Sequence, residues 1–336
     1  MQSPTTRRFP SPAATLIALS LAAASSFATM PMPLAAVRAS SALVFGLLAD
    51  PEAAEMSGLA FADAEVVKAL RLVEAGKAGE AVGGLTKLID SEELATTPRA
   101  DELRLAVCMI RVRTGEASKV KDDLQRMASS VPAEGGAAVP TASIARVLQK
   151  AADPKVLGKA GDVTQRDAWL KLLGTVRAEC ATAFEKSSDE LVKALKSENL
   201  GAIKSSAAKS DAAFAELAAI THDSTETENV AVARAAELRA PLEAFGSKGA
   251  ERNAHIDKLR AEWREIGEKR RAARDSGGKP QDFVAPQKAK AAEVDAARAE
   301  YDAWLDAAQP AYVFYDHVQQ QFGKAIPKLS VSLPRK

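Results

Sequence analysis

From Ala62 onward, apolar residues recur every three or four positions, which is the spacing of one face of an α-helix. Two apolar sets flank Gly76: Val66, Val67, Leu70 and Val73 before it, and Ala81, Leu85, Leu88 and Ile89 after it. A glycine between two helices favours a tight turn, because it adopts the left-handed conformation at little steric cost. The pattern therefore predicts a helical hairpin over residues 62–89.

The same arrangement returns 39 residues later, since Gly115 follows Gly76 by 39 positions and Leu124 follows Leu85 by 39. The apolar residues of this second unit again lie on both sides of the glycine: Val107, Ile110 and Val112, then Val120, Leu124 and Met127. A second helical hairpin is predicted here.

The stretch "ALRLVEAGKAGEAVGGLTKL" resembles the tetratricopeptide repeat, with small Ala69 and Ala81 on the two helices, Leu72 and Leu85 beside them and the turn at Gly76. The second unit has matching residues at Cys108, Gly115, Val120, Leu124 and Pro132. It departs from the family at Arg111, where a large apolar residue is expected, and the 39-residue period exceeds the family's 34. The resemblance covers two units, about a fifth of the chain. It implies a surface that binds a protein or peptide, with candidate contacts at Leu72, Leu85, Arg111 and Leu124. Two ordinary hairpins without a ligand are the alternative.

Segments rich in Pro, Gly, Ala and Ser divide the chain. We expect linkers at 29–60, with at most one short helix, and at 153–163. Residues 61–152 then hold the hairpins, a further linker at 131–143 and a short helix at 144–151. Residues 164–326 form a bundle of long helices, followed by a tail at 327–336.

The bundle begins with a predicted capping box, Thr164 with Asp167, and a long apolar stripe. That stripe consists of Trp169, Leu173, Val176, Cys180, Phe184, Leu191 and Leu195. A break at Ser187 and Ser188 is the alternative to one unbroken helix. The stripe of the next helix is Ile203, Ala207, Phe214 and Leu217.

The third helix of the bundle carries a heptad-like seam: Ile256, Leu259, Trp263, Ile266, Arg270 and Ala273. Pro241 and the glycines at 246–249 are expected to kink or open this helix. A fourth helix is expected to end before Pro310. Together these patterns predict an all-α protein, with hairpins followed by an antiparallel bundle with coiled-coil-like packing. Ile256, Leu259, Trp263 and Ile266 are the candidate surface for self-association.

Composition supports helices, because the chain is rich in Ala while aromatic residues make up only 5%. The N-terminal residues indicate the compartment to which the protein is sent. Arg7 and Arg8 precede an apolar stretch at 13–24, and small residues at Ser26 and Ala28 suit signal peptidase. We expect residues 1–28 to be removed on export to the periplasm or beyond, which leaves no membrane span. An uncleaved anchor is the alternative.

Charge and residue spacing exclude several kinds of site. The chain has a net charge of +1, and removing Arg7 and Arg8 leaves −1, so a broad cationic surface for nucleic acid is not expected. Glu262, Glu265 and Glu268 interleave the basic residues from Lys258 to Arg274, which favours a solvated helix face. His222, His255 and His317 lack zinc-binding spacing, and no cofactor motif is present.

Two cysteines remain. Cys108 and Cys180 form a disulfide, or each packs as a small buried hydrophobe. The combined expectation is an exported, non-enzymatic binding or scaffold protein with a protein or peptide partner. A self-associating structural or envelope-anchoring component is the first alternative. A hydrolase with an unrecognised site, for which His317 is the candidate, is the second.

Overall fold

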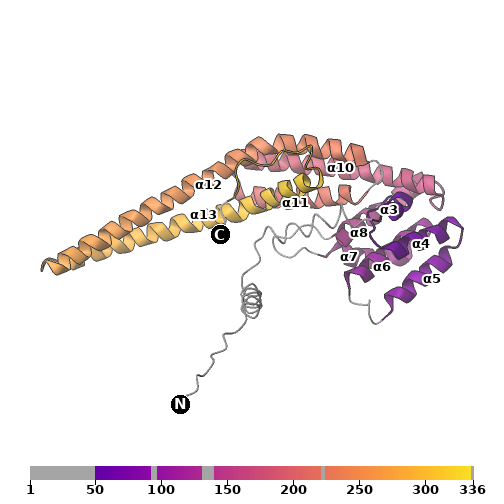
Figure 1. Cartoon of the computed structure of the whole chain (residues 1–336), viewed down its shortest axis with the longest axis horizontal. Coiled ribbons are helices and arrows are strands. Elements are labelled where there is room, and N and C mark those ends of the chain that lie inside the picture. The colour runs from indigo at the N-terminus through magenta and orange to yellow at the C-terminus, as the bar shows by residue number, and fades with distance from the viewer. Residues whose placement is uncertain (1–49, 92–96, 131–139, 221–223, 334–336) are drawn as a thin grey trace, which may run out of the picture. The chain divides into compact units, whose positions relative to one another are not determined.

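The computed structural model describes residues 50–333 except 92–96, 131–139 and 221–223 (Figure 1). Within these ranges every regular element is a helix, and the only other pairing is an isolated bridge between Leu59 and Ile220. The prediction of an all-α fold is confirmed. The predicted signal peptide lies outside the described residues.

Two helical hairpins occupy the N-terminal part, as the apolar pattern predicts. The first consists of α4 (Ala64–Glu74) and α5 (Ala78–Ile89), and the second of α6 (Pro98–Arg113), η2 (Ala117–Val120) and α7 (Lys121–Ala128). Gly76 and Gly115 turn the chain with φ of 76° and 81°. In both turns the amide that follows the glycine donates to a carbonyl five residues earlier. Lys77 donates to Leu72 at 2.8 Å, and Glu116 donates to Arg111 at 2.7 Å. The 39-residue offset therefore holds at the level of single hydrogen bonds.

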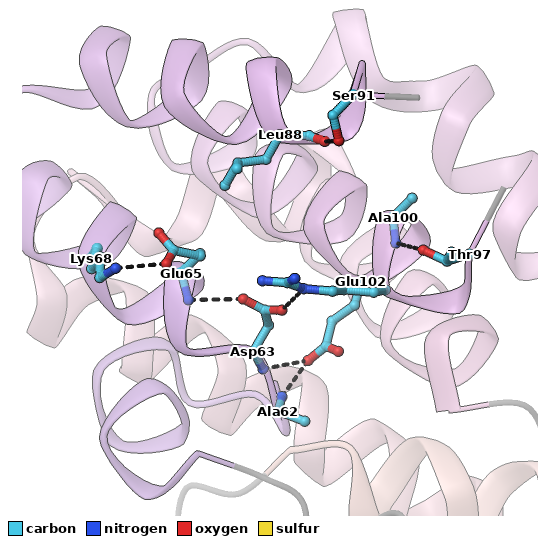
Figure 2. Close-up of polar contacts among 10 residues, drawn as sticks. Ala62, Asp63, Glu65, Lys68, Leu88, Ser91, Thr97, Ala100 and Glu102 are labelled. Atoms are coloured by element: carbon cyan, nitrogen blue, oxygen red, sulfur yellow. Dashed lines mark hydrogen bonds and ion pairs between the residues drawn. The ribbon is translucent and has the colours of Figure 1, made fainter. Parts of the chain in front are cut away.

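The first helices of the two hairpins are joined by one network of polar contacts (Figure 2). Asp63 caps α4 by accepting the Glu65 amide at 2.8 Å, and its other oxygen binds the Arg99 guanidinium. Glu102 on α6 accepts the amides of Ala62 and Asp63. Burial raises the pKa of Glu102 even though both amides lower it. These bonds satisfy amides at the start of α4 that the helix itself leaves unpaired.

Helix α6 lies at the centre of this part of the protein. It packs on α5 and α8 (Pro140–Ala151), and ten of its residues are buried, from Ala100 to Arg113. A helix covered on nearly every side offers little surface to a ligand.

Two of the segments predicted as linkers contain a short helix. The end of the 29–60 segment forms α3 (Pro51–Ser57), and the Ser57 carbonyl accepts the indole N–H of Trp169 at 2.7 Å. The segment 153–163 forms α9 (Pro154–Ala160) and buries Val163. One continuous apolar core joins the hairpins to the bundle, and residues 50–60 and 153–163 both contribute to it.

The bundle contains α10 (Arg166–Ser197), α11 (Leu200–Ala218), α12 (Ser224–Asp275) and, after η3 (Pro280–Phe283), α13 (Val284–Gln321). Helix α11 packs on both α10 and α13. Phe184, Phe214 and Phe314 come from these three helices, with ring centroids 5.6 to 6.5 Å apart. This cluster occupies the core of the bundle.

Several predicted helix boundaries are wrong. The Thr164–Asp167 capping box does not form, because the Thr164 hydroxyl binds Asp162 and α10 begins after Gln165 without a side-chain cap. By contrast, the prediction of one long helix is confirmed, because α10 continues through Ser187 and Ser188, which are both buried. Helices also continue through Pro241 and Pro310. Leu242 and Ala311, which directly follow these prolines, are buried, and that burial offsets the lost backbone hydrogen bond.

The glycines of α12 serve close packing, where the sequence suggests an opened helix. A Cβ atom at Gly249 would lie 2.5 Å from the Trp304 indole, and one at Gly246 would overlap the Tyr312 hydroxyl. That hydroxyl instead donates to the Leu242 carbonyl at 3.3 Å. Two aromatic side chains of α13 thus lie directly on the backbone of α12.

We expect Gly249→Ala to lower the free energy of unfolding by about 1–3 kcal/mol, because the added methyl group overlaps a fully buried indole. Urea unfolding followed by circular dichroism measures the change. The matched control is Gly174→Ala in α10, where nothing lies within 4 Å of the new atom. That substitution should stabilise by about 0.5–1 kcal/mol. Equal effects at the two sites would contradict the packing role.

Candidate functional site

Residues 260–303, here called the arm, are the part of the described protein least covered by other residues. They comprise the end of α12, η3 and the start of α13, and none of them is buried. The two helices lie side by side along their length (Figure 1). At the base of the arm, Leu259 and Trp304 are buried. Toward its base the arm packs on the rest of the protein, where Tyr301 stacks on Trp304, and beyond that α12 and α13 contact each other alone.

Polar and small residues hold the two helices of the arm together. Lys290 on α13 binds Glu262 on α12 at 3.0 Å, and Arg270 donates to the Gln287 amide oxygen at 3.1 Å. Hydrogen bonds and ion pairs with Glu293 and Glu262 raise the pKa of Lys290. Such exposed pairs contribute little stability. The arm accordingly lacks the wide apolar seam of a self-sufficient coiled coil.

The predicted self-association seam is divided by this packing. Ile256 and Leu259 are buried where α12 meets α13, and Ile266 is half-buried. Trp263 remains 39% exposed, and with Val284 at 42% it is one of two large apolar side chains exposed among the described residues. Of the four predicted residues, Trp263 alone presents a large surface.

The predicted contacts on the hairpins are mostly inaccessible. Leu85 and Leu124 are core residues, 2% and 1% exposed, so the prediction that they meet a partner is wrong. The apolar faces of α5 and α7 are turned inward and covered by neighbouring helices. Leu72 is half-buried against the core. Arg111 is also half-buried and lies 3.9 Å from Glu116.

His317 on α13 is buried, and its Nδ1 lies 2.8 Å from the Asp211 carboxylate on α11. The Phe214 ring meets the imidazole edge-on at 5.2 Å. The His317–Asp211 contact therefore joins α13 to α11 next to the Phe214 ring. His222 lies outside the described residues, and His255 is exposed beside Lys248 and Glu300 at the rim of a shallow hollow.

Both cysteines are free and buried, so the predicted disulfide is absent. Cys180 lies 3.4 Å from the Lys150 amine, which also binds Glu216 at 2.6 Å. Burial lowers the pKa of Lys150, but the bonds to Glu216 and Cys180 outweigh it and raise the pKa overall. Burial raises the pKa of Cys108 to about 12. Cys108 thus packs as a small apolar group, whereas the Cys180 thiol also accepts a hydrogen bond from Lys150.

Two features of the structure are not predicted by the sequence patterns. Arg113 is 1% exposed, donates to the Thr164 carbonyl at 2.9 Å and lies over the Trp169 ring. Val284 stands at the start of α13, where no apolar stripe marks it. For Arg113 the only signal is a charged residue within the apolar run "MIRVR".

Among the described residues, no cluster of three metal-binding side chains is present, and no helix combines the length and apolarity that crossing a bilayer requires. Comparison with family models, with curated proteins and with solved structures gives no match. The arm is therefore the candidate site on geometric grounds alone.

We expect two free thiols per chain when the protein is unfolded in urea without reductant, and no rapid reaction in the native state. The thiolate is the reactive form, and burial suppresses it. Titration with a chromogenic disulfide reagent measures both numbers. Cys108→Ala is the control and should leave one thiol. An unfolded, unreduced chain without reactive thiols would instead demonstrate the bridge.

Proposed function

We propose that this protein is an exported, non-catalytic binding or scaffold protein that contacts a protein partner through its arm. The observation that supports the proposal most is the exposed indole of Trp263 on a helix pair without buried residues. The resemblance of the hairpins to tetratricopeptide repeats agrees with a binding role. The covered α6 and the buried Leu85 and Leu124 favour the arm as the contact surface over the hairpins.

Tryptophan is among the residues that contribute most to protein interfaces, because its large ring buries much apolar area with few rotatable bonds. Trp263 is flanked by charged residues, including Glu262 and Arg264. An apolar anchor inside a polar rim is the usual composition of a protein interface. A helical partner that covers the indole would complete the thin seam between α12 and α13.

A second copy of this chain is the alternative partner. Trp263 lies on the heptad-like seam, so the indoles of two molecules could cover each other if their arms lay side by side. In that case the protein is a self-associating structural component of the envelope.

A photoreactive amino acid at position 263 should give one discrete adduct in cells that export the protein. The control position is Ala183 on α10, which is also exposed and should give none. An adduct with twice the mass of the chain identifies self-association, and another mass identifies a different partner. For the purified complex, Trp263→Asp should weaken binding by at least 2 kcal/mol, about 30-fold. Equal labelling at the two positions, or none at 263, contradicts the proposal.

Export has its own test. We expect the chain recovered from the envelope or the medium to begin at Thr29, as measured by mass spectrometry of the intact protein. Ala28→Arg should block this processing, because signal peptidase requires a small residue at that position. A chain that keeps residues 1–28 and stays in the cell interior would refute the export proposal.

A further inference from the structure

The far end of the arm carries a concentrated positive charge. Residues 269–290 contain two acidic side chains, Asp275 and Asp282, and seven basic ones: Lys269, Arg270, Arg271, Arg274, Lys279, Lys288 and Lys290. The net charge of this segment is +5, whereas the whole chain has +1, so the remaining residues sum to −4. The glutamates that interleave the basic residues of α12 end at Glu268.

Much of this charge is not neutralised within the protein. In the described ranges, Arg271, Lys279 and Lys288 form no ion pair, and all three are exposed. Lys269 binds Glu265 at 2.6 Å, and Arg274 lies 3.6 Å from Asp275. Both of these pairs are exposed to solvent, whereas Lys290 is paired with Glu262 and Glu293. The unpaired charge is therefore carried by arginines and lysines nearer the turn.

The same segment exposes apolar side chains. Val284, 42% exposed, follows the half-buried Phe283 directly at the beginning of α13. The turn between the helices runs from Gly277, with φ of 74°, to Pro280. Phe283 and Val284 thus lie just after the turn, between Lys279 and Lys288 in the sequence.

We infer that the far end of the arm docks onto the surface of an anionic lipid bilayer. Basic side chains near such a surface each contribute about fivefold in affinity, and apolar groups beside them enter the interface between headgroups and acyl chains. The net charge of −4 on the remaining residues opposes nucleic acid, because a long polyanion would also run past acidic parts of the protein. A compact basic end suits a flat anionic surface better.

This site is separate from the proposed protein contact. Trp263 precedes Asp275 by 12 residues, which at 1.5 Å per residue is about 18 Å along α12. A bilayer that meets the end of the arm leaves the indole outside the lipid. The inference therefore goes beyond the proposed function and does not depend on it.

Sedimentation of the full chain with vesicles tests the inference. One set contains phosphatidylcholine alone, and the other an equal mixture with phosphatidylglycerol. We expect markedly tighter binding to the anionic vesicles, and weakening as salt rises. The triple variant R271E/K279E/K288E should bind them at least about 100-fold more weakly. Val284→Asp should weaken binding about tenfold, which corresponds to the burial of one valine side chain.

The matched control is the triple variant K171E/K193E/K204E, which makes the same change in net charge on exposed positions of α10 and α11. It should bind nearly as well as the parent chain. All variants share residues 1–28, so differences between them report on the arm, and circular dichroism establishes that each is folded.

Equal binding to both vesicle types would overturn the inference. So would equal losses in the two triple variants, or displacement from vesicles by duplex DNA or an acidic protein. Cross-linking at Trp263 is unaffected by any of these outcomes, so the two proposals fail separately.

Discussion

Two glycines one turn apart on α12 determine how the second half of the protein is assembled. Without Cβ atoms, Gly246 and Gly249 let the rings of Tyr312 and Trp304 lie on the α12 backbone. That contact fixes the position of α13 along α12 and holds Phe314 and His317 against α11. Beyond it the buried contacts end within a few turns, and the two helices continue as the arm. The same contact thus closes the core and marks where the free surface begins.

Most of the helices were predictable because apolar periodicity reflects local geometry. The hairpins follow from their stripes and from Gly76 and Gly115, whose left-handed turns few other residues tolerate. The errors arise where tertiary packing outweighs a local signal. Pro241 and Pro310 each remove one backbone hydrogen bond, at about 3 kcal/mol, yet buried neighbours such as Leu242 and Ala311 keep the helices intact. The Thr164 capping box fails because Asp162 competes for the same hydroxyl.

The candidate surface was less predictable than the fold. A stripe shows which face of a helix is apolar, but not whether another helix covers it. Leu85 and Trp263 both lie on such stripes. Leu85 is buried by neighbouring helices, whereas Trp263 stays exposed because the adjacent part of α13 carries polar and small residues. The basic end of the arm was missed for a similar reason. Over Lys258–Arg274 as a whole, acidic and basic residues alternate, but after Glu268 acidic residues become rare. Chain reversal then adds the lysines of α13 to the same end.

The unbonded state of Cys108 and Cys180 has a consequence for how the protein is made. Its core closes by packing alone, without a covalent cross-link. The packing that stabilises the folded state therefore does not depend on the oxidation of the two thiols. Production in reducing or in oxidising surroundings should yield the same native state.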